Sequence, residues 1–150
     1  MKKIILILSL LLLVNCGFNA ILSTKDIKFK INNIETPSND KISLKIKKKL
    51  QIYQKIDTPQ KDYNLKINTQ KNIKIASKDT KGDPLTYEMI IVTKLEIFSK
   101  DKFIKDIVYK KNLNYNNRTN KFELKQFEKN SLENLINQIT ENIIVNLLSL

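Results

Sequence analysis

The feature that most constrains the fold of this chain is the recurrence of apolar residues at odd-numbered positions between Leu85 and Tyr115, on both sides of a polar stretch at residues 99–102. Strand side chains point alternately to two faces, so this pattern predicts two long strands joined as a hairpin. The apolar face carries Tyr87, Met89, Ile91, Leu95, Ile97, Phe103, Ile107, Tyr109, Leu113 and Tyr115. The opposite face is polar, which predicts that only one side of the hairpin is buried.

Weaker patterns precede the hairpin. Apolar residues alternate with polar ones from Ile27, and again over residues 63–77, which predicts two more strands. The second is polar at residues 69–72, where we expect a bulge or a pause. Between the two strands, apolar residues recur every three to four positions from about residue 39 to residue 54, which predicts a helix.

The last segment, from about residue 122 to residue 148, has a helical stripe of apolar residues opposite Asn, Gln and Glu. A helix of this length extends about 40 Å, enough to lie along the hairpin. The predicted order is β-α-β-β-β-α, with each strand apolar on one side only. This predicts an α+β fold, a two-layer sandwich whose four-stranded, mostly antiparallel sheet has both helices on one face.

The N-terminus has the pattern of an export signal that ends at a lipid-modified cysteine. Two lysines precede an apolar run, Ile4 to Val14. This run would extend only about 16 Å, roughly half the hydrocarbon thickness, which predicts a signal peptide rather than a membrane-spanning helix. Cys16 follows the run and is the single cysteine, with Leu13 before it and Gly17 directly after. The pattern resembles the lipobox of bacterial lipoproteins.

The lipobox implies that residues 1–15 are removed and that Cys16 carries a diacylglycerol and an N-acyl chain. Residues 16–26 then form a lipidated tether, and residues 27–150 form a single domain. Gly17, where a retention signal would have Asp, favours the outer membrane. The alternative is an ordinary secretory signal with Cys16 near the cut, but a lone thiol in an exported protein would have no disulfide partner.

The composition argues against most catalytic and metal sites. The chain has no His or Trp, one Cys and two Gly, so nucleophile–base pairs, zinc ligand sets and Gly-rich phosphate loops lack their residues. We expect no catalytic residues, no metal site and no enzymatic activity. The net charge of +12 suggests an anionic partner, for which we do not expect nucleic acid. An A+T-rich coding sequence, which accumulates lysine, isoleucine and asparagine codons, is the competing explanation for the charge.

Three features together resemble the lipopolysaccharide-assembly lipoprotein family LptE, in its alphaproteobacterial form. They are the lipobox followed by Gly17-Phe18, the β-α-β-β-β-α order, and the segment Phe122-Glu123-Leu124-Lys125-Gln126-Phe127-Glu128. The resemblance covers nearly the whole chain. It implies an outer-membrane lipoprotein on the periplasmic side that sits in the lumen of the β-barrel LptD, plugs it and helps lipopolysaccharide reach the outer leaflet. The alternative is a structural or binding lipoprotein of another envelope complex.

The tip of the predicted hairpin is a candidate ligand site. Lys100 and Lys102 lie at the turn, and Lys105 lies just beyond it. A lysine there is a mobile point charge suited to a phosphate, so we expect these residues to contact lipid A phosphates or the acidic inner core of lipopolysaccharide. The alternative is simple solvation of the lysines, because Asp101 and Asp106 dilute the charge.

Overall fold

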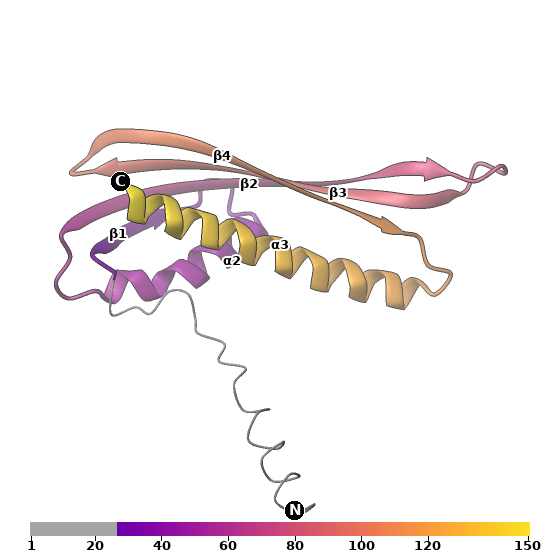
Figure 1. The fold of residues 1–150 in the computed structure, drawn as a ribbon, viewed down its shortest axis with the longest axis horizontal. Coiled ribbons are helices and arrows are strands. Elements are labelled where there is room, and N and C mark those ends of the chain that lie inside the picture. The colour runs from indigo at the N-terminus through magenta and orange to yellow at the C-terminus, as the bar shows by residue number, and fades with distance from the viewer. Residues whose placement is uncertain (1–26) are drawn as a thin grey trace, which may run out of the picture.

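The computed structural model describes residues 27–150, and its architecture confirms the predicted fold class (Figure 1). The elements are β1 (Phe29–Glu35), α2 (Lys41–Leu50), the 3-10 helix η3 (Gln51–Lys55), β2 (Lys61–Lys78), β3 (Pro84–Ser99), β4 (Lys102–Asn116) and α3 (Lys121–Ser149). The sheet order is β1-β2-β3-β4, with β1 parallel to β2 and the other pairs antiparallel. Both helices cover one face of this sheet. The expected signal peptide, the tether and Cys16 lie outside the described residues.

The core lies between the sheet and the two helices. Its fully buried side chains include Ile67, Met89, Ile91, Leu95 and Ile97 of the sheet, and Ile46, Leu50, Ile136 and Ile139 of the helices. On the strands these are alternate positions, as the sequence pattern predicts. Full burial of one such side chain contributes about 1.5–3 kcal/mol, so this layer is the main source of the fold's stability.

Strand β2 continues without a break through its polar middle. The hydroxyls of Thr69 and Thr93 lie 3.1 Å apart and are both buried, so each satisfies the other inside the core. The prediction of a bulge at residues 69–72 is therefore wrong. The register shifts later, between Ile75 and Ser77, near the end of the strand.

The side chain of Asp40 caps helix α2. Its Oδ1 accepts hydrogen bonds from the backbone N–H groups of Ile42, at 3.0 Å, and Ser43, at 2.8 Å. Partial burial acts to raise the pKa of Asp40. Hydrogen bonds from the Ser38 hydroxyl, at 2.6 Å, and from these backbone groups outweigh that effect, so the pKa is lowered from its usual value.

The predicted helix over residues 39–54 is divided in two. Its α-helical part ends at Leu50, and the chain continues as the 3-10 helix η3. The tighter turn places Tyr53 in the core, where its ring stacks on Phe29 with 5.5 Å between centroids. This contact connects the end of the helical segment to β1, where the sheet begins.

Helix α3 lies along most of the sheet (Figure 1). The side chain of Asn120 caps it and accepts from two backbone N–H groups of the first turn, at 3.0 and 3.3 Å. Glu133 forms ion pairs with Lys45 and Lys49 of α2, at 2.6 and 3.3 Å, which link the two helices at the surface. None of the helices in residues 27–150 is long and apolar enough to cross a membrane.

Candidate functional site

The three lysines predicted to bind lipopolysaccharide lie at and beside the β3–β4 turn. Ser99 pairs with Lys102 across this turn, and both residues between them have positive φ, 48° for Lys100 and 62° for Asp101. Two successive residues with positive φ are typical of a type I′ turn, whose twist matches that of its flanking strands. The turn is therefore a tight two-residue connection between β3 and β4.

All three lysines are exposed. Lys100 is in the turn and Lys102 begins β4, whereas Lys105 lies further along that strand. Within residues 27–150, none of the three forms an ion pair. Asp101 and Asp106 are exposed nearby and reduce the local positive charge without pairing with these lysines. The ammonium groups are accordingly available to an anionic ligand.

A bulge brings two large apolar side chains to the surface beside the lysines. The register shifts after Ile97, which pairs with Lys105. Phe98 pairs with Phe103, and Ile104 is left as the extra residue of the bulge. The rings of Phe98 and Phe103 meet edge to face, 5.8 Å apart. Phe103 is 58% exposed and Ile104 is 46% exposed.

Two conclusions follow from this bulge. The prediction that Phe103 shares the buried face of the hairpin is wrong, because the extra residue reverses the phase of the strand before it. Phe103 and Ile104 are also the part of the candidate site that sequence analysis missed. The sequence does contain an indication of the bulge: Phe103 and Ile104 are adjacent apolar residues between lysines, and they interrupt the alternation of apolar and polar residues.

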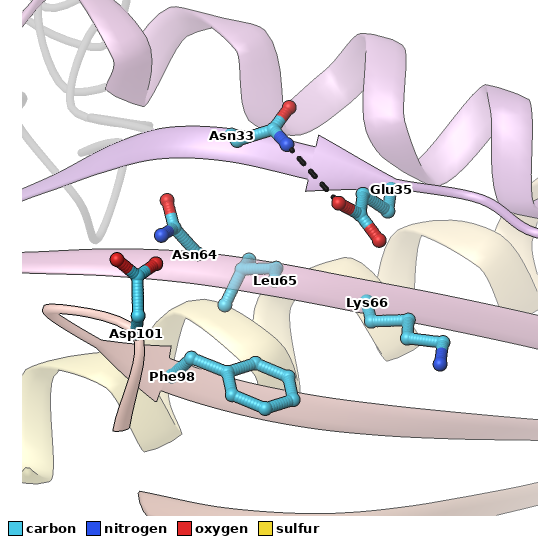
Figure 2. Close-up of a pocket in the computed structure, with 7 residues that line it drawn as sticks. All are labelled: Asn33, Glu35, Asn64, Leu65, Lys66, Phe98 and Asp101. Atoms are coloured by element: carbon cyan, nitrogen blue, oxygen red, sulfur yellow. Dashed lines mark hydrogen bonds between the residues drawn. The ribbon is translucent and has the colours of Figure 1, made fainter. Parts of the chain in front are cut away.

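A hollow on the outer face of the sheet adjoins the turn (Figure 2). Its volume is about 350 Å³, and it is lined by Asn33, Glu35, Asn64, Leu65, Lys66, Phe98 and Asp101. The Asn33 amide donates to Glu35 at 3.5 Å, which is a long and weak hydrogen bond. In the part of the chain that the structure describes, no group of three His, Cys, Asp or Glu residues could hold a metal ion. The hollow therefore offers mixed hydrogen-bonding groups without a charge of one sign.

The outer face beyond the hollow carries paired charges, together with the partly exposed Ile90 and Val92 and the exposed Val108. Glu88 accepts from Lys74 at 2.9 Å and from the Asn112 amide at 3.0 Å. Glu96 pairs with Lys94 at 2.9 Å. These lysine hydrogen bonds lower the pKa values of both glutamates. Because these two glutamates have lysine partners of their own, they do not neutralise the positive charge of the unpaired lysines at the β3–β4 turn.

The β3–β4 turn lies at the same end of the molecule as the start of the described chain (Figure 1). Phe29 at the start of β1 pairs with Lys61 at the start of β2. Asn64, slightly further along β2, pairs with Phe98, the residue that precedes the turn by two positions. Helix α3 ends at this end too, whereas the β2–β3 turn and the start of α3 lie at the other end.

No protein-family model matches the sequence, and no curated protein matches it either. Solved structures do match. The crystal structure of the rare lipoprotein B from Shewanella oneidensis has a TM-score of 0.61 at 13% identity, over 80% of this chain and 94% of that chain. The solution structure of a lipoprotein B from Nitrosomonas europaea has a TM-score of 0.62 at 12% identity, over 89% of this chain and 91% of that chain. The crystal structure of a minor lipoprotein from Acinetobacter baumannii has a TM-score of 0.55 at 16% identity, over 81% of this chain and 95% of that chain.

At these identities the comparisons show a common fold. The match spans more than nine-tenths of each of the three chains, so it includes their whole architecture rather than one shared hairpin. Residues 27–150 therefore have the fold of these bacterial lipoproteins, with its sheet and both of its helices.

Proposed function

We propose that this chain is a lipid-anchored outer-membrane lipoprotein that binds an LptD-type β-barrel from the periplasmic side, plugs its lumen and assists lipopolysaccharide transport. The observation that carries the proposal is the fold, which three bacterial lipoproteins share over nearly their full length. The lipobox pattern at Cys16 supports the anchor, with a diacylglycerol and an N-acyl chain as the covalent modification. The resemblance to the LptE family supports the barrel as the partner.

The shape of the domain supports a role as a plug. Strand β2 has 18 residues, which corresponds to a length of about 60 Å. One face of the long sheet is buried under the helices, and the other presents mainly Asn, Lys and Glu side chains, with Val108 and Phe103 as exposed apolar residues. The interior of a large membrane barrel is polar, so a sheet face rich in Asn, Lys and Glu can lie against its wall. The role is structural, and no catalytic residue is assigned.

Co-purification tests this proposal. The mature lipoprotein, extracted in detergent and captured by a C-terminal tag, is expected to bring down one β-barrel of much greater mass in a one-to-one ratio, identified by mass spectrometry. Recovery of a different envelope complex would instead support the alternative, a periplasm-facing structural or binding lipoprotein. Recovery of the lipoprotein alone, under conditions that keep barrels folded, would refute the barrel partnership.

The lysines of the β3–β4 turn are the proposed contact for lipopolysaccharide. Reversing charge with Lys100→Glu and Lys102→Glu should weaken binding, most clearly at low salt, where screening is least. Lys48→Glu with Lys55→Glu is the matched control, because it changes the net charge equally at exposed positions elsewhere. Both double variants should keep the thermal unfolding midpoint and barrel capture of the parent protein. Unchanged binding at low salt in the first variant would exclude the turn as the contact.

A further inference from the structure

We propose that the β3–β4 turn is the membrane-facing end of the free lipoprotein. Phe103 and Ile104 enter the interface of an anionic lipid bilayer, while Lys100, Lys102 and Lys105 contact the lipid phosphates. This inference rests on the lipid anchor of the proposed function, but it does not depend on the barrel partner. It assigns a role to the two exposed apolar residues, which the lysine–lipopolysaccharide contact does not use.

The chemistry of the turn fits a bilayer surface. Phe103 and Ile104 are adjacent, largely exposed and flanked on both sides by lysines. Apolar side chains partition into the boundary between headgroups and acyl chains, and nearby lysines extend to the phosphates. Each lysine near an anionic surface adds to this attraction. The tight two-residue turn keeps Lys100, Lys102 and Phe103 close together, and Lys105 follows beyond the bulge.

The course of the chain places this surface near the membrane. The described chain begins at Ile27, at the end of the molecule that carries the turn (Figure 1). Residues 16–26 span at most about 40 Å, so an acyl group at Cys16 keeps that end within about this distance of the bilayer. Strand β3 has 16 residues and is about 53 Å long, so the opposite end of the molecule lies about that far from the tethered end.

The opposite end differs from the β3–β4 turn chiefly in its distance from the anchor. Its β2–β3 turn carries Lys78 and Lys81 together with Asp79 and Asp83, so its charges balance. Phe122, at the start of α3, is 76% exposed and thus more accessible than Phe103. Arg118, Lys121 and Lys125 lie near Phe122 in the sequence, with Glu123 as the acidic neighbour, so Phe122 also has basic surroundings. Exposure and local charge therefore do not favour Phe103 over Phe122, whereas the position of the anchor does. The two residues make opposite predictions that one experiment can separate.

The absence of tryptophan from the chain makes that experiment direct. Phe103→Trp and, as the matched control, Phe122→Trp each introduce a single fluorophore at an exposed aromatic position. The mature lipoprotein is purified in detergent and reconstituted into vesicles of phosphatidylethanolamine and phosphatidylglycerol that contain no lipopolysaccharide. We expect the Phe103→Trp protein to show blue-shifted emission and several-fold stronger quenching by spin-labelled lipids than the Phe122→Trp protein.

Other outcomes overturn the inference. Equal quenching of both variants, stronger quenching of Phe122→Trp, or no quenching of either would show that this end does not face the bilayer. A response of Phe103→Trp that requires added lipopolysaccharide would assign the surface to that lipid instead. Replacing the three lysines by serine in the Phe103→Trp background should reduce quenching at low salt. Barrel capture of Phe103→Trp, measured separately, distinguishes failure of this inference from failure of the proposed partnership.

Discussion

Replacing Ile139 by alanine tests whether α3 closes the core over the sheet. Ile139 is 0% exposed and lies in mid-helix between the buried residues Ile136 and Ile143. The change removes three side-chain carbons from a packed interior, and such a change typically costs about 2–5 kcal/mol. The higher helix propensity of alanine offsets only about 0.4 kcal/mol of this loss of stability. Because a domain has a total stability of about 5–15 kcal/mol, we expect a large fall in the free energy of unfolding.

Urea unfolding followed by far-ultraviolet circular dichroism measures this loss. Val145→Ala is the matched control, since it shortens an aliphatic side chain on the same helix at a position that is 57% exposed. It should change the free energy of unfolding by less than about 0.5 kcal/mol. Asn137→Ala, at a half-buried polar position, should also have little effect. Equal losses for Ile139→Ala and Val145→Ala would refute the assignment of the buried stripe.

Three further predictions concern single side chains. Cys16→Ser should leave the precursor uncleaved on a gel, because the lipoprotein signal peptidase acts on the acylated cysteine; normal cleavage and membrane retention would contradict the lipobox. Asp40→Ala should cost about 1 kcal/mol through loss of the α2 cap. Because the pKa of Asp40 is lowered on folding, its ionisation stabilises the folded state above the ordinary carboxyl pKa, and this stabilisation is lost as pH falls through the lower value. Thermal unfolding of the parent and the variant at neutral and acid pH measures this loss. Burial raises the pKa of Tyr109 to about 12, so the contribution of its neutral form to folding stability is complete below pH 10 and is lost as pH rises towards 12. Tyrosinate absorbance should show that Tyr109 ionises at higher pH than an ordinary tyrosine, and Tyr109→Phe should remove this late ionisation.

The most periodic segments were the most predictable. The final helix, expected over residues 122–148, spans Lys121–Ser149, and the third strand begins at Pro84 where Leu85 was expected. A long one-sided pattern permits few alternatives, because a shift of one residue in a strand would turn its whole apolar set towards solvent. The two-layer arrangement follows from the same fact, since each one-sided strand requires a cover on its apolar side.

The errors arose where a distant residue decides the local structure. In the sequence, the polar residue Thr69 interrupts the apolar pattern of β2. In the structure, its hydroxyl forms a hydrogen bond with the hydroxyl of Thr93 on the neighbouring strand. The bulge at Ile104 similarly depends on how β4 aligns with β3, and periodicity along one strand does not specify that alignment. The lysines of the candidate site were therefore identified, whereas the exposure of Phe103 beside them was not. A single extra residue changes the site from a basic turn into an amphipathic one.

That amphipathic character connects the two proposals. Under these two proposals, the end that meets the bilayer is at the level of the membrane, so it would also be the end that first reaches the periplasmic mouth of a β-barrel. On entry into a polar lumen, Phe103 and Ile104 must leave the lipid interface, and the lysines exchange bilayer phosphates for those of lipopolysaccharide. Bilayer contact and barrel binding then compete for one surface. Addition of the barrel should consequently reduce the quenching of Phe103→Trp by spin-labelled lipids, and undiminished quenching in the complex would show that the turn stays outside the lumen.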